Sequence, residues 1–274
     1  MTPPPIAAGF RMSGLSCILS GDHGPRRIGQ GMESIIHKQP SDAPTASERA
    51  AKQGEASGGR RRLSQARAEA TRSRILHCAR QVFAAHGFAA ANVRDIARAA
   101  GTTHSMITYH FGSKDELWRE AVRDMFALLQ RQVIDPVEAE AELDFEQRFR
   151  KLVHLYTRYS AEHPEHARIT VSETIAGGER LEWMVREFVS ANQAATTGNL
   201  TQLLDRGLVP DMPLPSLLYA MVGMIQLPFM LQKEAQLAMG YDFMTDEAVE
   251  AHAEAVVRLL TGSVHDPATR KSPS

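Results

Sequence analysis

The sequence predicts an all-α protein with an N-terminal three-helix segment and a C-terminal helical bundle. From about Ser64 onward, apolar side chains recur every three to four residues, which is the period of a helix with one buried face. Helix-capping residues precede these segments and glycines follow several of them, so the pattern divides into separate helices. No strand-like alternation of useful length interrupts it, and we therefore expect no β-sheet.

The two ends of the chain are expected to be disordered tails, residues 1–62 and 263–274. Residues 1–62 are rich in Pro, Gly, Ser and Ala and lack apolar periodicity. Cys17 and Cys78 form no CxxC pair, which argues against a disulfide framework and suits a reducing cytoplasm. The N-terminus makes a poor signal peptide, and the longest apolar run, Leu217 to Leu231, is shorter than the roughly twenty residues needed to cross a bilayer. We therefore expect a cytoplasmic protein with no membrane partner.

The first two helices are recognised by an apolar face and by the residues at their ends. The apolar face of the first helix consists of Ile75, Ala79, Val82 and Phe83. Gly87 is its expected C-terminal cap, because glycine adopts a left-handed backbone without steric cost. Asn92 is the expected N-cap of the second helix, which stops at Gly101. The apolar side of the second helix consists of Val93, Ile96, Ala97 and Ala100.

The next two helices begin at hydroxyl side chains. Thr103 is the expected cap of a third, very short helix that ends near Phe111. Ser113 and Glu116 have the spacing of a capping box, in which each side chain satisfies a free backbone N–H group. They predict a fourth helix that runs to about Val133.

Further helices are expected beyond Asp135-Pro136. Asp144 with Gln147 opens a helix through Tyr159, and Pro164 opens one that ends at Gly177-Gly178. The remaining expected helices span Arg180 to Arg206, Ser216 to Met230, and Thr245 to Leu260. The Ser216 to Met230 helix is apolar on nearly all sides, which predicts a buried element.

Charge is distributed unevenly along the chain. Residues 60–123 contain twelve basic and five acidic side chains, whereas residues 124–274 contain thirteen basic and twenty-two acidic ones. The first segment is therefore a candidate for binding a polyanion, and the second is not.

The second and third helices have the spacing of a helix-turn-helix. Ala97 is small where the helices cross, Gly101 allows the sharp turn, and Ile107 fills the angle between the helices. If the third helix lies in a DNA major groove, His104, Ser105 and Thr108 face the base edges, whereas Thr102, Thr103, Tyr109 and Lys114 lie beside phosphates. Asn92, the cap of the second helix, completes this set of DNA-binding candidates.

The third helix contains no Arg, Lys, Asn or Gln between Thr102 and Thr108, and these are the residues that read guanine or adenine with two hydrogen bonds. Sequence specificity would therefore rest on His104, hydroxyl groups, methyl contacts and DNA shape.

The stretch ILHCARQVFAAHGFAAANVRDIARAAGTTHSMITYHFGSKDELWREAV resembles the N-terminal DNA-binding domain of the tetracycline-repressor (TetR/AcrR-type) family. The matching positions are Gly87-Phe88, Val93, Ile96-Ala97, Ala100-Gly101, Tyr109, His110-Phe111, Ser113-Lys114 and Leu117. Two positions depart from the family pattern. Thr108 stands where many members have tyrosine, and Thr102-Thr103 stands where Val-Ser is usual, so Tyr109 is left to supply the aromatic phosphate contact.

The resemblance implies a helix-turn-helix DNA-binding domain at residues 63–112 and a helical regulatory and dimerisation domain at residues 113–262. It implies a homodimeric repressor that binds a double-stranded DNA operator and that a small-molecule inducer releases. The expected dimer surface is a four-helix bundle of Ser216 to Met230 and Thr245 to Leu260 from each subunit, although packing inside one subunit would explain the same apolar residues.

A pocket for the inducer would be lined by the middle helices, and its methionines suggest a hydrophobic or aromatic compound. The apolar candidates are Tyr156, Trp183, Phe188, Met221, Met224 and Met230, with His154 or Gln226 for polar recognition. Ordinary core packing is the alternative for each of them.

Other functions have weaker support in the sequence. His163-Pro164-Glu165-His166 suggests a metal site, but Pro164 at a helix start breaks the spacing that a helical histidine pair needs. The chain has no nucleophile elbow, phosphate loop or glycine-rich dinucleotide turn, so we expect neither an enzyme nor a cofactor. The alternatives left open are a regulator without a ligand or controlled by a protein partner, and a helical-bundle enzyme.

Overall fold

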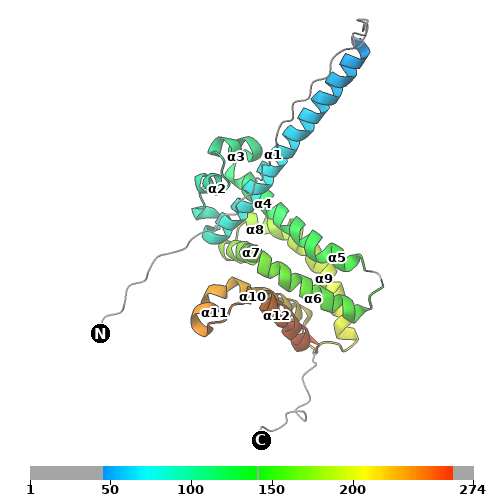
Figure 1. Ribbon diagram of the computed structural model, residues 1–274. Helices are drawn as coiled ribbons and strands as arrows, with labels where there is room; N and C mark the ends of the chain where they lie inside the picture. Colours follow the sequence, from blue (N-terminus) through cyan, green and yellow to red (C-terminus); the bar gives the residue numbers. More distant parts are fainter. Residues whose placement is uncertain (1–45, 141, 262–274) are drawn as a thin grey trace, which may run out of the picture. The chain divides into compact units, whose positions relative to one another are not determined.

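The described part of the chain is built from helices joined by turns and short loops (Figure 1). In this computed structural model, backbone is described for residues 46–140 and 142–261, and side chains for residues 65–140, 142–190 and 197–261. The elements are α1 (Ala46–Ala90), α2 (Val93–Ala99), α3 (His104–Phe111), α4 (Lys114–Leu129), η1 (Gln130–Ile134), α5 (Asp135–Glu138), α6 (Phe145–Glu162), α7 (Pro164–Ala176), α8 (Glu179–Met184), η2 (Val185–Val189), α9 (Ser190–Asp205), α10 (Leu214–Met230), α11 (Gln232–Met239) and α12 (Asp246–Leu260).

The chain divides into two units, Met1–Glu55 and Ala56–Ser274. Of the first unit, the structure describes residues 46–55, the first part of α1. The sequence predicted a disordered tail up to residue 62, whereas α1 begins at Ala46. This segment contains several Ala, Glu, Lys, Arg and Gln residues, whose side chains lose little freedom in a helix. The rest of both predicted tails lies outside the described residues.

The predicted caps between α1 and α4 lie at helix ends or breaks in the structure. α1 is interrupted at the predicted cap Gly87, whose φ of 68° and ψ of 169° lie in a region that favours glycine. Asn92 caps α2 by accepting a hydrogen bond from the Arg94 N–H, and Thr103 caps α3 through Met106. At the fourth helix only half of the predicted capping box is present. This half is the hydrogen bond that the Ser113 side chain accepts from the Glu116 N–H.

Two predicted helices differ from the structure because each contains a π turn. The fourth helix, predicted to run to about Val133, does not end there, since α4 continues through η1 into α5. Pro136 has no N–H and would clash with a carbonyl in a regular α-helix, and the wider turn before it accommodates this. The predicted helix from Arg180 to Arg206 is likewise α8, η2 and α9 in succession.

Two apolar cores organise the residues from 65 onward. The first is shared by α1 to α4 and η1 with Tyr159, Ile169, Trp183 and Met184 from α6 to α8. The second joins α6, α9, α10 and α12. The predicted domain boundary after residue 112 is therefore no break in packing, because Leu117 and Trp118 of α4 complete the core of the N-terminal helices.

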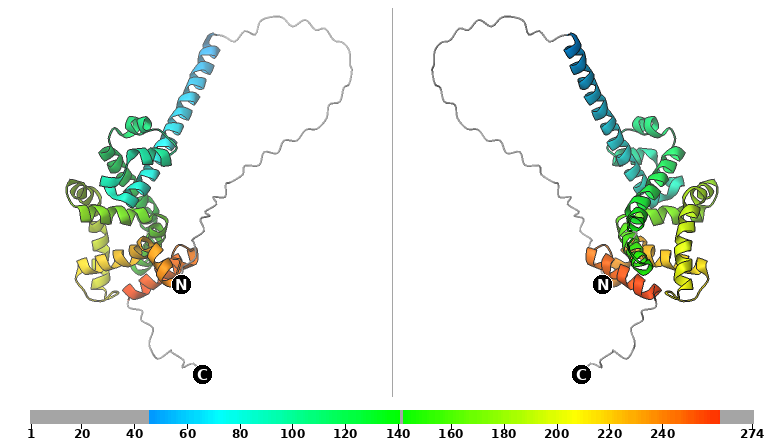
Figure 2. Two further views of the ribbon diagram at one scale, coloured as in Figure 1. Left: turned by 90° about the vertical axis from the view of Figure 1, so that its left-hand side faces the viewer. Right: turned by 90° about the vertical axis from the view of Figure 1, so that its right-hand side faces the viewer.

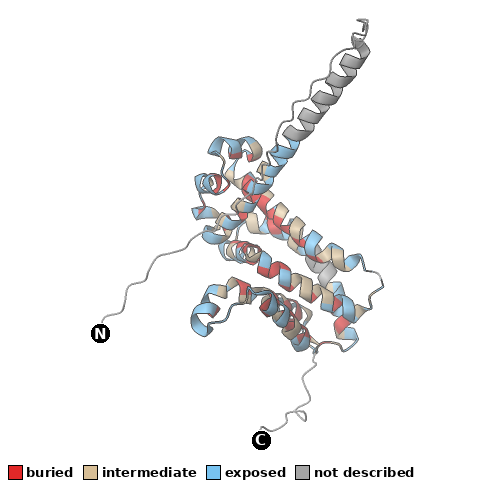
Figure 3. Cartoon of the chain, in the orientation of Figure 1, coloured by how far each residue is buried: buried red, intermediate tan, exposed pale blue. Residues whose placement is uncertain are grey.

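α11 is a short helix that sequence reasoning missed. It follows α10 after a bend of 68°, and Ala235 is its one buried residue. Most of α11 is pale blue in Figure 3, the colour of exposed residues. The Gln232 side chain fixes its start by accepting from the Phe243 N–H and donating to Asp242. Within the described residues, no single helix is long and apolar enough to span a membrane, and α10 with α11 passes that test only as a bent pair.

Candidate functional site

α3 presents one face to solvent and the other to the core. Ile107 and Phe111 are buried, whereas His104, Ser105 and Thr108 are exposed and Tyr109 is 81% exposed. The predicted base-facing residues therefore share the open side of the helix, next to the turn at Gly101, whose φ is 59°. This geometry leaves α3 free to enter a DNA groove.

Several predicted DNA-binding residues also hold the local backbone. The Asn92 Oδ1 accepts from the Arg94 N–H at 2.9 Å, and the Thr103 Oγ1 accepts from the Met106 N–H at 3.3 Å. The Thr108 hydroxyl donates to the His104 carbonyl at 3.1 Å. Thr102 is half-buried after the turn. Hydrogen bonds to the local backbone therefore fix the orientation of Asn92, Thr103 and Thr108 at the surface.

Lys114 lies at the first position of α4. Its Nζ donates to the Ala89 carbonyl at 3.2 Å and lies 4.7 Å from the centroid of the Phe88 ring. The ammonium group is thus held against the end of α1, beside the helix-turn-helix. The exposed Arg94 and Arg98 of α2 were not among the predicted DNA-binding residues, although the local excess of basic residues was a signal that could have found them.

Lys114→Ala is expected to weaken binding to all DNA sequences several-fold and to reduce the slope of log affinity against log salt by about 0.9, the value of one phosphate contact. Fluorescence anisotropy over a salt series measures both quantities. Lys233 is an exposed lysine of α11, and Lys233→Ala is the matched control, which should change neither the affinity nor the salt slope. An unchanged slope for Lys114→Ala would remove Lys114 from the phosphate contacts.

His110 lies at the junction between α3 and α4. Its ring centroid is 5.3 Å from that of Tyr109 and 6.0 Å from that of Phe111, and its buried Nε2 has no hydrogen-bond partner among the described residues. The described residues also contain no group of three or more His, Cys, Asp or Glu side chains that could hold a metal ion. The contacts of His110 are therefore those of a packed aromatic ring.

A cavity of about 390 Å³ lies between the middle helices and α10. Its lining residues are Phe126, Leu129, Val133, Ile134, Leu152, Tyr156, His166, Thr170, Thr174, Leu181, Met184, Val185, Val189, Leu218, Tyr219, Met221, Val222 and Gln226. The α4–η1 segment supplies one wall, so the helix that begins beside the DNA-binding segment also borders the cavity.

Some of the predicted ligand residues lie at this cavity and others do not. Tyr156, Met221 and the polar candidate Gln226 are among its lining residues. Trp183 packs on Trp118, with the ring centroids 5.6 Å apart, and Phe188 stacks on Phe126 at 4.7 Å. Met224 borders a separate groove beside α12, and Met230 is half-buried at the end of α10.

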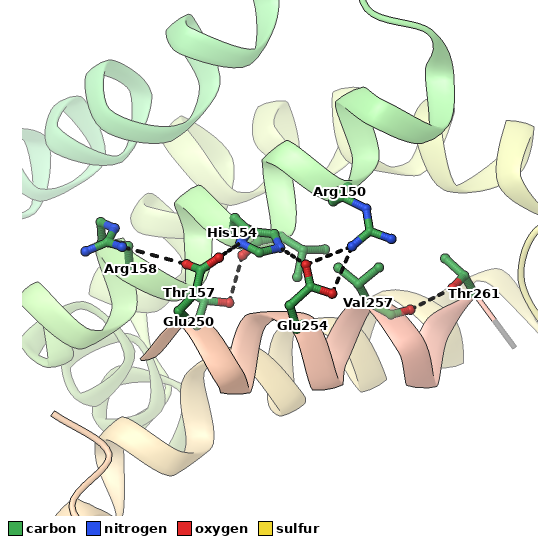
Figure 4. Close-up of polar contacts among 9 residues, drawn as sticks. Arg150, His154, Thr157, Arg158, Glu250, Glu254, Val257 and Thr261 are labelled. Atoms are coloured by element: carbon green, nitrogen blue, oxygen red, sulfur yellow. Dashed lines mark hydrogen bonds and ion pairs between the residues drawn. The ribbon is translucent and has the colours of Figure 1, made fainter. Parts of the chain in front are cut away.

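His154, the other polar candidate, belongs to a charged contact between α6 and α12 (Figure 4). Its Nδ1 lies 3.0 Å from Glu250 and its Nε2 lies 3.1 Å from Glu254. Arg150 also donates to Glu254, at 2.8 Å. These polar contacts hold one side of α12 on α6 instead of facing the cavity.

The polar groups of the cavity come from α6, α7 and α10. The Gln226 Nε2 donates to the Tyr156 hydroxyl at 2.7 Å. His166 is 5% exposed, and its Nδ1 lies 2.8 Å from the hydroxyl of Tyr159. Sequence reasoning considered His166 only as a metal ligand, because nothing in its local pattern indicates that α7 turns it toward a cavity.

Burial decides the protonation of these groups. It lowers the pKa of His166 to about 4, although the carboxylate of Glu165 acts in the opposite direction. It raises the pKa of Tyr156 far above its usual range. Near neutral pH, both side chains are therefore uncharged.

A buried charged cluster connects α1, α4 and α7. Arg80 is 4% exposed and forms ion pairs with Asp124 and with Glu165, whose Oε1 lies 3.4 Å from the Arg80 Nε. Burial acts to raise the pKa of Glu165, but the hydrogen bond from His163 and the charge of Arg80 help to bring it to about 2. Glu165 precedes the cavity residue His166, so the cluster joins the cavity wall to the first helix.

Comparison with known proteins shows what the N-terminal helices and the longer chain are similar to. Residues 75–121 match the family described as bacterial regulatory proteins, tetR family. The HTH-type transcriptional repressor NicS of Pseudomonas putida is 32% identical over 114 residues, which cover 40% of this chain and 51% of NicS. The chain thus spans about half the length of that curated relative. The HTH-type transcriptional repressor SCO4008 of Streptomyces coelicolor is 28% identical over 203 residues, covering 70% of this chain and 96% of that repressor.

Among solved structures, AibR in complex with isovaleryl coenzyme A and operator DNA has a similar fold. The TM-score is 0.55 at 16% identity, over 70% of this chain and 98% of AibR. The likeness extends from the helix-turn-helix into the C-terminal helices, and at this identity it establishes the all-α fold.

Proposed function

We propose that the chain is a TetR-type transcriptional regulator whose DNA-binding domain includes residues 75–121, and that it acts as a homodimeric repressor released from its operator by a small molecule. The observation that carries this proposal is the pairing of an open recognition helix, α3, with a cavity whose wall includes α4. The similar repressors and the AibR complex with ligand and operator DNA support it.

Two copies of α3 are needed for tight operator binding, because one helix-turn-helix contacts only a short DNA segment. A second copy about one turn of the DNA helix away raises the affinity. The surface proposed for pairing consists of α10 and α12, which pack side by side (Figure 2). Its exposed apolar side chains include Leu227 and Leu259, which are 50% and 67% exposed. They border a groove between α10, α11 and α12, which suits an apolar helix face of the second copy.

Induction would follow from a shift of α4. Phe126 and Leu129 of α4 line the cavity, while Lys114 at its other end is bonded to the end of α1. A ligand that fits the cavity better when α4 is displaced would favour that conformation and change the spacing of the two recognition helices. The ion pair between Arg80 and Asp124 would carry the displacement of α4 to α1.

Selection of bound fragments from a promoter library identifies the operator, and anisotropy then measures its affinity with and without a compound that stabilises the protein. Induction predicts that such a compound weakens operator binding by about tenfold or more, the range of ordinary allosteric coupling. If the two affinities agree, the chain is instead a DNA-binding regulator that does not respond to that ligand.

A further inference from the structure

The 390 Å³ cavity contains polar groups but no formal charge among its described lining residues. We infer that it selects an uncharged, largely apolar ligand that donates a hydrogen bond from a hydroxyl or amide group to His166, with Gln226 beside it. This inference rests on the proposed function, because it names the chemical class of the inducer.

The lining excludes charged ligand groups for an energetic reason. None of the lining residues is Asp, Glu, Lys or Arg, and the lining is dominated by aliphatic and aromatic side chains. Glu165 is next to a lining residue, but its charge is engaged with Arg80 and His163. A ligand carboxylate or ammonium would therefore lose its hydration without an opposite charge to replace it.

His166 supplies a specific acceptor. The Tyr159 hydroxyl lies 3.2 Å from the Met125 carbonyl and 2.8 Å from the Nδ1 of His166, and we assign its proton to the bond with the carbonyl, which makes Nδ1 the donor to the Tyr159 oxygen. Its Nε2 is then an unprotonated acceptor with no partner among the described residues. Because His166 is 95% buried and lines the cavity, a ligand donor is the natural partner for this atom.

Gln226 adds a second polar contact on α10. Its Nε2 is bonded to Tyr156, while its Oε1 has no partner in the described part of the chain. The hydroxyls of Thr170 and Thr174 already donate to backbone carbonyls. His166 on α7 and Gln226 on α10 therefore bring two acceptors to a mostly apolar lining, and this favours a compound with a polar group and a hydrocarbon body.

The test compares matched pairs of compounds that differ in charge. Calorimetry and thermal shift at pH 8 would compare decanol with decanoate, naphthalenemethanol with naphthoate, and biphenylcarboxamide with biphenylcarboxylate. We expect at least one uncharged member to bind and to be preferred to its carboxylate by roughly a hundredfold or more. Absence of binding by every uncharged probe, or equal binding of the carboxylates, would overturn the inference.

A variant tests the polar contact separately. Gln226→Leu should weaken the hydroxyl or amide probe by up to about tenfold, the value of one hydrogen bond, and leave biphenyl itself unchanged. Gln202→Leu, at an exposed glutamine of α9, is the matched control. Equal effects of the two variants would argue against Gln226 as a ligand contact.

The same probes separate this inference from the proposed function. An uncharged probe that binds without releasing operator DNA supports the ligand class and contradicts induction through this cavity. A carboxylate that binds more tightly and releases DNA contradicts the ligand class and leaves the inducible repressor intact.

Discussion

Arg80→Met is expected to destabilise the protein by about 3–5 kcal/mol, because it leaves the carboxylates of Asp124 and Glu165 without their shared cation. Glu165 is 2% exposed, and its Oε2 already lacks a hydrogen-bond partner among the described residues, so water cannot readily replace the guanidinium. Urea unfolding followed by circular dichroism measures this loss.

Arg72→Met is a matched control on the same helix. Arg72 of α1 also pairs with an acidic residue of α4, Glu120, but its side chain is 33% exposed. Its replacement should cost about 1 kcal/mol or less, since partly hydrated ion pairs contribute little. Equal losses for the two variants would show that the buried cluster has no special energetic role.

The cost of Arg80→Met should also depend on pH. The pKa of Glu165 is depressed from 4.5 to about 2, so the stability that its ionised form contributes is present above about pH 4.5 and is lost as the pH falls through 2. The difference between wild type and Arg80→Met should therefore shrink below about pH 4.5. A constant difference down to pH 3 would mean that Glu165 is not the carboxylate that Arg80 stabilises.

If the chain pairs through α10 and α12 as proposed, Leu227→Glu and Leu259→Glu are expected to yield a monomer and to lower operator affinity by about a hundredfold, because the two recognition helices then bind DNA independently. Both leucines are at least half exposed in the single chain, so a carboxylate there should leave the fold intact while opposing burial against a second copy. Light scattering reports the oligomeric state, and anisotropy reports DNA binding.

Ile175→Glu is the control for this pair. Ile175 of α7 is 81% exposed and lies outside the α10–α12 surface, so the same change in charge should leave the dimer and its operator affinity unaltered. Persistence of the dimer in both leucine variants would place the subunit contact elsewhere.

Local signals explain why most helix boundaries were predictable. Gly87, Asn92 and Thr103 act through backbone groups at most a few residues away. The identity of these residues therefore indicates a helix end without reference to the rest of the chain. The π turns at η1 and η2 carry no comparable signal. α11 was missed because its start depends on Gln232 meeting Asp242, ten residues later.

The candidate ligand residues show the limit of the same reasoning. Tyr156 and Trp183 look alike in sequence, as large aromatic residues of the middle helices, yet Tyr156 lines the cavity and Trp183 fills the core against Trp118. Helical periodicity identifies a buried face but does not say whether that face meets another side chain or an empty space. His166 was not assigned to the cavity for the same reason.

The sequence by itself determined the all-α fold, the helix-turn-helix and the exposed residues of α3, because each follows from contacts between near neighbours in the chain. Only the tertiary structure decided which residues surround the cavity and which charges are buried. Arg80 and Glu165 are separated by 85 residues, and their ion pair exists because α1 and α7 pack together. Such contacts depend on how helices are arranged in space, which no local pattern of residues specifies.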